Sequence, residues 1–191
     1  MGFIRVKGHG NHRYAYKVTA EWTKKGPRQK VSEYLGKVES PKKVREIPLT
    51  PEEISEINYE TLIIRLAENE LAAHGFEKKG AQMEISIDGK TICAEISNKS
   101  TKIAHRKGAG KEKACVLEIN DGFLSGSTLS ELINFRASAL PSDDNFTSEP
   151  KDGEELARLV VNAGLSVSQE IFLKIYEKCT GKNLGLTAQK D

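Results

Sequence analysis

The residues best suited to chemistry in this chain are the lysines and arginines near its amino terminus. The first 48 residues hold 12 Lys and Arg against 4 Asp and Glu, whereas the other 143 hold 17 against 23. The overall charge of +2 therefore divides into +8 and −6. Aromatic side chains, among them the single tryptophan Trp22, stand between these basic residues. A concentrated positive field beside aromatic rings suits a phosphate-rich partner, so residues 1–48 predict binding to nucleic acid.

Nine basic side chains form the predicted nucleic-acid-binding set: Arg13, Lys17, Lys24, Lys25, Arg28, Lys30, Lys37, Arg106 and Lys107. Each phosphate that they neutralise releases counterions, so binding should depend strongly on salt. The last two belong to a glycine-rich segment, residues 106–111, which lacks the order of a P-loop and is more typical of a solvated hairpin loop. In the alternative interpretation, Tyr14, Tyr16 and Trp22 form the core of a small sheet and the lysines only keep it soluble.

The remaining polar residues do not form a catalytic or metal-binding set. His9 and His12 lie close together in a glycine-rich turn, but no cysteine or carboxylate nearby completes four ligands. His105 and Cys115 could be neighbours across a hairpin, yet no third group is available to orient such a pair. The sequence therefore predicts no catalytic residue, no metal site and no cofactor, and it favours a protein that is not an enzyme.

Two features of the carboxy-terminal half have the outline of binding motifs. Asp143, Asp144 and Glu149 belong to the densest acidic cluster, but their spacing matches no calcium-binding loop. Two helical segments around residues 163–166 are arranged like a helix-turn-helix. The second of them carries mixed charge, which is poorly suited to contacting base edges. We therefore expect a polar surface loop and an ordinary helical hairpin.

The elements that position the basic residues begin with three strand-like runs, at residues 3–6, 14–22 and 29–35, separated by turn formers. In the middle run, alternate side chains share a face. One face carries Tyr14, Tyr16, Val18, Ala20 and Trp22, and the other carries Arg13, Ala15, Lys17, Thr19 and Glu21. This alternation predicts a half-buried strand whose aromatic face is covered and whose charged face lies in solvent.

Short aromatic and basic motifs run through the same segment: Tyr14-Ala15-Tyr16-Lys17-Val18, Trp22, Pro27-Arg28-Gln29-Lys30-Val31 and Tyr34-Leu35-Gly36-Lys37-Val38. In these motifs the chain resembles the amino-terminal segment of certain insertion-sequence transposases and of uncharacterised archaeal proteins that share it. The resemblance covers about 35 residues and implies a small β module associated with nucleic acid. It does not include the catalytic domain of those transposases, in which three acidic residues hold two metal ions, so transposition is not expected.

The rest of the chain predicts a larger α+β unit. Residues 40–49, with two prolines, predict a connector. Thr50-Pro51-Glu52-Glu53 is a capping box, which starts a helix expected over 51–74 with a possible break near Asn58 and an end at Gly75. Asp88-Gly89 predicts a hairpin of residues 83–87 and 92–96. A second hairpin is expected from 102–105 and 114–119, and further helices from 127–135, 153–163 and 167–179.

The sequence thus predicts an α+β protein in which helices cover a roughly four-stranded antiparallel sheet, preceded by a small antiparallel β module. The expected division is 1–39 for the basic module, 40–49 for the connector, 50–181 for the α+β domain and 182–191 for a disordered tail. Three widely spaced cysteines and the lack of a long apolar run favour a cytoplasmic protein. The preferred function is nucleic-acid binding; the alternatives are a protein-interaction or scaffold subunit that uses its acidic domain for partners or self-association, and a small-molecule binder or enzyme with an unidentified site.

Overall fold

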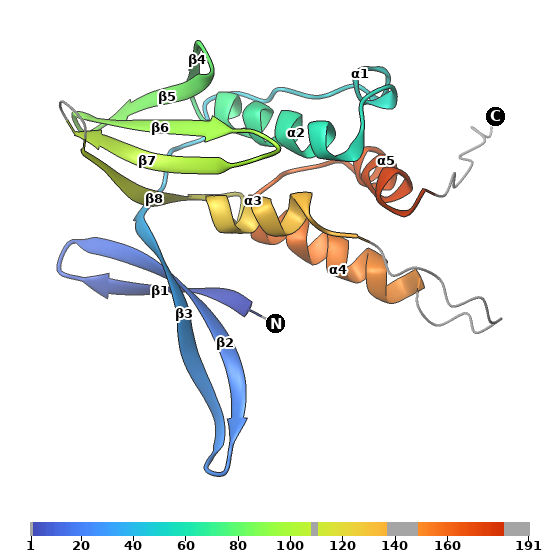
Figure 1. The fold of residues 1–191 in the computed structure, drawn as a ribbon. Coiled ribbons are helices and arrows are strands. Elements are labelled where there is room, and N and C mark those ends of the chain that lie inside the picture. The colour runs from blue at the N-terminus through green and yellow to red at the C-terminus, as the bar shows by residue number, and fades with distance from the viewer. Residues whose placement is uncertain (1, 108–110, 137–148, 182–191) are drawn as a thin grey trace.

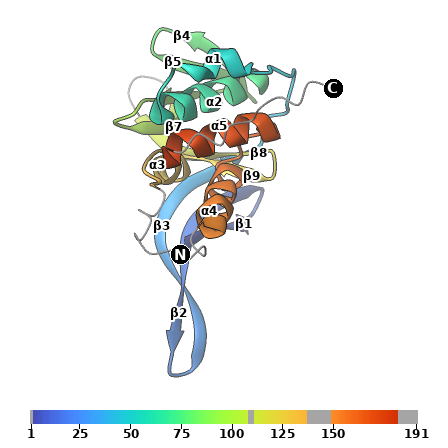
Figure 2. The same cartoon turned by 90° about the vertical axis from the view of Figure 1, so that its right-hand side faces the viewer.

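The computed structural model of the protein describes residues 2–107, 111–136 and 149–181. These residues form an α+β fold in which a mixed, mostly antiparallel sheet of nine strands is packed against five helices (Figure 1). The predicted fold class is therefore confirmed. The helices gather on one side of the sheet, while the first three strands project away from the rest of the molecule (Figures 1 and 2).

The strands are β1 (Gly2–His9), β2 (His12–Thr23), β3 (Gly26–Glu39), β4 (Glu77–Lys79), β5 (Gln82–Ile87), β6 (Lys90–Ile96), β7 (Thr101–Lys107), β8 (Lys111–Ile119) and β9 (Gly122–Leu124). The helices are α1 (Pro51–Ser55), α2 (Tyr59–Ala73), α3 (Gly126–Ile133), α4 (Glu149–Asn162) and α5 (Gln169–Thr180). The sheet runs in the order β1-β2-β3-β8-β7-β6-β5-β4, and β9 pairs with β8 off this path.

Two short sequence motifs, the Asp88-Gly89 turn and the Thr50 capping box, have the structures predicted for them. Asp88 and Gly89 both have positive φ, 50° and 72°, as the tight turn between β5 and β6 requires. The Thr50 capping box is also present, because Glu53 N donates to Thr50 Oγ1 and Thr50 N donates to Glu53 Oε2. The helix expected over 51–74 is interrupted at residues 56–58, where Asn58 caps a new helix by accepting from Thr61 N.

The predicted four-stranded sheet corresponds to β5 to β8, but it is only the middle of a larger one. Residues Lys37–Glu39 of β3 pair in parallel with Cys115–Leu117 of β8, and this joins the amino-terminal strands to the body. Local alternation cannot reveal such a pairing, because it links segments far apart in the sequence. It forms because Leu35 and Val38 are apolar, and they are buried in a cluster with Val116 and Ala15.

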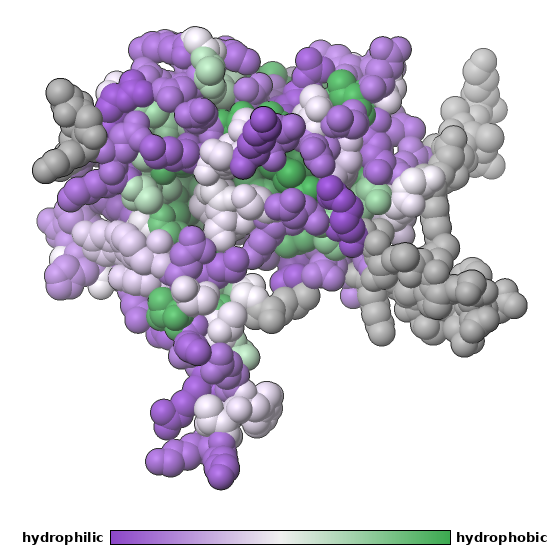
Figure 3. Space-filling view, viewed as in Figure 1, coloured by the Kyte–Doolittle hydropathy of each residue, from purple (hydrophilic) through white to green (hydrophobic). Residues whose placement is uncertain are grey.

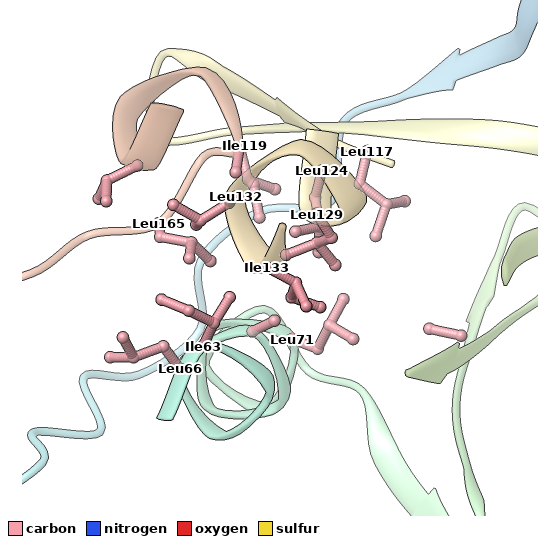
Figure 4. Packing of buried hydrophobic residues seen from close by; sticks show 14 of the residues in the cluster. Ile63, Leu66, Leu71, Leu117, Ile119, Leu124, Leu129, Leu132, Ile133 and Leu165 are labelled. Carbon is pink, nitrogen blue, oxygen red and sulfur yellow. The ribbon is translucent and has the colours of Figure 1, made fainter. Parts of the chain in front are cut away.

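The main hydrophobic core lies between the helices and the sheet (Figure 4). Side chains of α2, α3 and the β8–β9 hairpin meet there, including Ile63, Leu71, Leu129, Leu132 and Leu117, each 0% exposed. Helix α5 adds Ile171 and Ile175, and α4 adds Leu156. The apolar stripes that predicted these helices therefore all point into one core.

The segment after β3 has no helix or strand until α1, as expected of the predicted connector at residues 40–49. It is nevertheless fastened to the body, because Val44 N and Arg45 N both donate to Ala73 O at the end of α2. Helices α4 and α5 form the expected helical hairpin, although α4 begins at Glu149 rather than near residue 153. The polar loop expected over 138–151 lies mostly outside the described residues, as does the tail at 182–191. Among the described helices, none has the length and apolar character needed to cross a membrane.

Candidate nucleic-acid interface

Strands β1, β2 and β3 form a projecting element, residues 2–39, which we call the arm (Figure 1). Strand β1 accompanies β2 only as far as the pair Gly2 and Thr19. Beyond that pair, β2 and β3 continue alone as a two-stranded ribbon, which we define as residues 20–30 so that it includes Lys30, the partner of Thr19. Every residue of the ribbon except Gly26 is exposed. Figure 3 shows the ribbon as a narrow and largely hydrophilic extension of the molecule.

The turn at the end of the ribbon is built by its own residues. Thr23 Oγ1 donates to Gly26 O at 2.8 Å and accepts from Lys25 N at 3.3 Å. Gly26 has φ +98°, a conformation that side chains with a Cβ rarely adopt. These hydrogen bonds close a two-residue turn between β2 and β3, and Lys24 and Lys25 are the two residues at its tip.

The inner face of the arm packs on the body. Along β1, the half-buried Ile4 and Val6 alternate with exposed residues, and both pack with Ala15, Val116 and Phe123. Cross-strand partners share a face, so the face of β2 that carries Arg13, Ala15 and Lys17 is also inner. The sequence had predicted this charged face to lie in solvent, and that prediction is wrong for Ala15 and Lys17, although Arg13 and Glu21 are exposed. Ala15 is fully buried, and the charged neighbours of Ala15 reach acidic groups on the body.

Three of the predicted phosphate-binding residues are occupied in ion pairs near the root of the arm. Arg13 Nη2 lies 2.6 Å from Glu118 Oε2 and also donates to Ser40 Oγ. Lys17 pairs with Glu131 of α3. Lys37 Nζ lies 2.6 Å from Glu39 Oε1. The contacts of Arg13 and Lys17 fasten the arm to the body and to the start of the connector, and all three pairs reduce the positive charge that the root presents.

The other four basic residues of the predicted arm set gather on the ribbon. Lys24, Lys25 and Arg28 are exposed and have no ion pair within the described part of the chain. Lys30 lies 3.6 Å from Glu21, but both side chains are mostly exposed, so water and salt screen this pair. The ribbon therefore concentrates four cations and one carboxylate at the point of the molecule farthest from the body.

The two predicted residues outside the arm lie on a different part of the sheet. Arg106 is in β7, on the opposite side of β8 from the arm, and it donates to Glu84 and Gln82 at 2.7 Å each. The backbone of Lys107 ends β7, but its side chain and residues 108–110 lie outside the described structure. The fold therefore does not bring Arg106 together with the ribbon.

The outer face of the arm carries the aromatic side chains. Tyr34 is flanked by Tyr16, with ring centroids 5.4 Å apart, and by Tyr14 at 6.4 Å. Partial burial, followed by the neighbouring Tyr14 and Tyr16, raises the pKa of Tyr34 above its ordinary value of 10.0. Lys7 Nζ lies 5.3 Å from the centre of the Tyr16 ring, within the range of a cation–π contact.

Sequence reasoning did not select two basic residues of this outer face, Arg5 and Lys7. Both are exposed and stand opposite Tyr16 and Tyr14 across the β1–β2 pairing. Arg5 Nη1 also donates to Gln29 Oε1 of β3 at 2.7 Å. The alternation of Phe3, Arg5 and Lys7 with Ile4 and Val6 indicates a strand with two different faces. In a strand only eight residues long, this alternation does not indicate which face packs on the body and which face lies in solvent.

A buried histidine lies where the arm joins the body. His105 Nε2 is 2.9 Å from Glu39 Oε1, but neither ring nitrogen of His105 makes a well-aligned hydrogen bond within the described structure. Burial lowers the pKa of His105 below its ordinary value, although the Glu39 carboxylate opposes that change. Burial also raises the pKa of the nearby Cys115 thiol to about 12, which keeps it protonated and unsuited to nucleophilic attack.

The other groups considered as ligands do not form a metal site in the described structure. His9 and His12 are cross-strand partners at the end of the β1–β2 hairpin. Within residues 2–107, 111–136 and 149–181, no three His, Cys, Asp or Glu side chains stand close enough to hold a metal ion. Asp143 and Asp144 lie outside the described residues.

One pocket, of about 220 Å³, lies between the connector, α2 and α5, and Lys43, Asn69, Glu70 and Ser168 are among its lining residues. It is smaller than typical ligand sites. Its buried carboxylate, Glu70, already accepts from Asn120 Nδ2 at 2.6 Å and from Ser166 N at 3.3 Å. Glu70 therefore links α2 to the loops after β8 and α4, and the described structure favours this structural role over ligand binding.

No protein-family model matches this chain, and no curated protein or solved structure shows significant similarity to it.

Proposed function

We propose that this protein binds nucleic acid without catalysing a reaction, and that the ribbon of residues 20–30 makes the principal contact. The observation that supports the proposal most is the position of Lys24, Lys25, Arg28 and Lys30, four cations on an exposed ribbon that projects from the body. Such a group can neutralise several phosphates at once, and the release of their counterions favours binding.

The shape of the ribbon suits this role. A two-stranded β-ribbon is narrow enough to enter the major groove of duplex DNA, and it can equally lie along the backbone of a single strand. Its cross-strand pairs place Arg28 and Lys30 on one face, beside Glu21 and Thr19, while Lys24 and Lys25 occupy the turn. Phosphates can thus be contacted from the tip and from one side.

The body supports the arm both mechanically and electrostatically. The ion pairs of Arg13 with Glu118 and of Lys17 with Glu131 hold the root of the arm in place. Residues 49–191 carry more acidic than basic side chains, so the body repels a polyanion. A projecting ribbon keeps the bound phosphates away from that repulsion.

The test is to measure binding of the full-length chain to fluorescently labelled duplex DNA, single-stranded DNA and single-stranded RNA by fluorescence anisotropy at about 50 mM salt. The variant K24Q/K25Q/R28Q removes three of the four ribbon cations. We expect its affinity for the best-bound probe to be roughly 10- to 100-fold lower than that of the wild type, since most of the phosphate contacts are lost.

The matched control is K42Q/K99Q/K113Q, which removes the same charge from exposed lysines outside the arm. We expect it to bind nearly as well as the wild type, because these lysines do not lie on the ribbon. Equal losses of affinity in the two variants would show that binding depends only on the net charge of the protein and not on the position of the ribbon cations. Absence of binding to every probe would reject the proposed function and favour a protein partner.

A further inference from the structure

The outer face of the arm exposes an unusual amount of hydrophobic surface. In the described part of the chain, six large hydrophobic side chains are exposed, and four of them belong to this face: Phe3 (41%), Trp22 (86%), Val31 (47%) and Tyr34 (54%). Single exposed hydrophobic residues are normal, but a concentration of them on one element indicates a binding surface. Phosphate binding by the cations of the ribbon does not explain this exposed hydrophobic surface.

The strand register arranges these side chains in a row. Tyr34 stands opposite Tyr16, Val31 opposite Val18, and Trp22 opposite Pro27. Cross-strand partners project from the same face, so the row continues from the root of the arm to the end of the ribbon. From Tyr16 to Trp22 the row extends over six residue steps of β2, or about 20 Å.

Two rings of the row have free surface for a ligand. Trp22 is the most exposed large hydrophobic residue described, and Tyr34 is half exposed while Tyr14 and Tyr16 support it. The Tyr16 ring, by contrast, is covered by Lys7. Between Trp22 and Tyr34, the row exposes Val31, whereas the cross-strand partner of Val31, Val18, is only 1% exposed.

The charged side chains around the row indicate which class of ligand it can bind. Arg5 and Lys7 project from the outer face beside the row. The carboxylates of Glu21 and Glu33 lie on the inner face, opposite Arg28 and Lys17. Glu39, at the root, pairs with Lys37. The exposed hydrophobic row is therefore bordered by cations, which suits a flexible polyanion that also carries flat apolar groups.

We propose that the outer face of the arm binds the unpaired bases of single-stranded nucleic acid, with Trp22 and Tyr34 stacking on bases and with Arg5 and Lys7 contacting phosphates. This inference rests on the proposed function and specifies its substrate class. Single strands combine charged phosphates with free base faces, whereas a duplex keeps its base faces stacked on one another. The same row could serve DNA or RNA, because every base has a face that can stack.

Trp22 is the only tryptophan of the chain, so its fluorescence reports directly on the row. The probes are a single-stranded DNA of about 15 nucleotides, an RNA of the same sequence, the matching duplex, and a single-stranded DNA of equal length without bases. We expect the two single strands to quench Trp22 strongly and the abasic strand to leave it nearly unchanged. Equal quenching by the abasic strand or by the duplex would overturn the inference.

Affinity measurements on variants provide the second test. We expect Trp22→Ala and Tyr34→Ala each to weaken binding to single strands by roughly 5- to 150-fold, which is the effect typical of removing one stacking ring. Val161→Ala is the matched control, because Val161 is 54% exposed but lies in α4, outside the arm. Unchanged affinity of both arm variants would overturn the inference.

The two proposals fail in different ways. If K24Q/K25Q/R28Q weakens binding but Trp22→Ala and Tyr34→Ala do not, the ribbon binds phosphates and the stacking inference is wrong. If no probe binds at low salt, both proposals are wrong, and the exposed row is then a surface for another protein. A difference between the DNA and RNA strands would identify which of the two the arm prefers.

Discussion

At the scale of single residues, His105 provides the clearest dependence on pH. Its folded pKa is lowered, chiefly because burial disfavours the charged imidazolium. Between the folded value and the ordinary value of 6.5, the unfolded chain binds more protons than the folded one. The free energy of unfolding therefore rises with pH through this window and falls as the solution is acidified below about pH 7.

We expect urea denaturation of the full-length chain between pH 5 and pH 7 to show this loss of stability, and the variant His105→Gln to show a smaller pH dependence. His9→Gln is the control, since His9 is exposed at the end of β1. If His105→Gln keeps the wild-type dependence on pH, other groups must cause it, and the structural interpretation of His105 is wrong.

The cysteines allow a second prediction at this scale. Cys115 is 2% exposed and the pKa of its thiol is raised to about 12, while Cys179 is half-buried. We expect iodoacetamide to modify Cys179 in the native protein at pH 8 much faster than Cys115, because only a thiolate that the reagent can reach will react. Mass spectrometry of the labelled chain measures both rates. Fast labelling of Cys115 would show that the joint between β3 and β8 opens readily.

At the scale of elements, Gly36 controls how closely the arm approaches the body. It has φ +124°, and a Cβ built on it would lie 2.3 Å from Ala114 O of β8. We expect Gly36→Ala to lower the free energy of unfolding by more than about 1 kcal/mol, since the strained backbone and the clash both act on the folded state. Thermal denaturation measures the change.

The control for Gly36→Ala is Gly8→Ala in β1. A Cβ at Gly8 would have no neighbouring atom within 4 Å, and the φ of Gly8 is not positive, so this change should be nearly neutral. Equal effects of the two substitutions would show that the β3–β8 junction tolerates a side chain at Gly36, contrary to the structure.

The elements also show what local sequence can and cannot predict. The Thr50 capping box and the Asp88-Gly89 turn depend on residues within four positions of each other, and both are present as predicted. The inner face of the arm depends on Val116 and Phe123, about a hundred residues away, and there the prediction was wrong. For the same reason, the ion pair of Arg13 with Glu118 could not be predicted from the basic segment alone.

At the scale of the whole molecule, one core stabilises the helices and the sheet together. Leu129 of α3 is fully buried among residues of α2, β8 and β9 (Figure 4). We expect Leu129→Ala to cost roughly 2 to 5 kcal/mol of the free energy of unfolding, because it leaves a cavity. Chemical denaturation measures this loss, and Val161→Ala on the surface should change stability by less than about 0.5 kcal/mol. A small effect of Leu129→Ala would contradict the packing of α3.

The division of charge also belongs to this scale. A basic segment beside an acidic remainder could be recognised from the sequence, and the structure separates the two in space, because the ribbon projects away from the body. The sequence could not show which of the basic residues are available. That depends on the acidic partners Glu118, Glu131 and Glu39, which occupy Arg13, Lys17 and Lys37 and leave the ribbon as the main accessible positive surface of the arm.

The most direct test of the central claim is the salt dependence of nucleic-acid binding by the full-length chain and by K24Q/K25Q/R28Q. If the four ribbon cations contact phosphates, raising the salt from about 50 to about 200 mM should weaken wild-type binding by roughly 50- to 150-fold. The variant should lose most of the ribbon's share of this dependence, because it retains only one of the four ribbon cations, while Arg5 and Lys7 keep their own share. An equally steep dependence in the variant, or a flat one in the wild type, would contradict the claim that the ribbon binds the phosphate backbone.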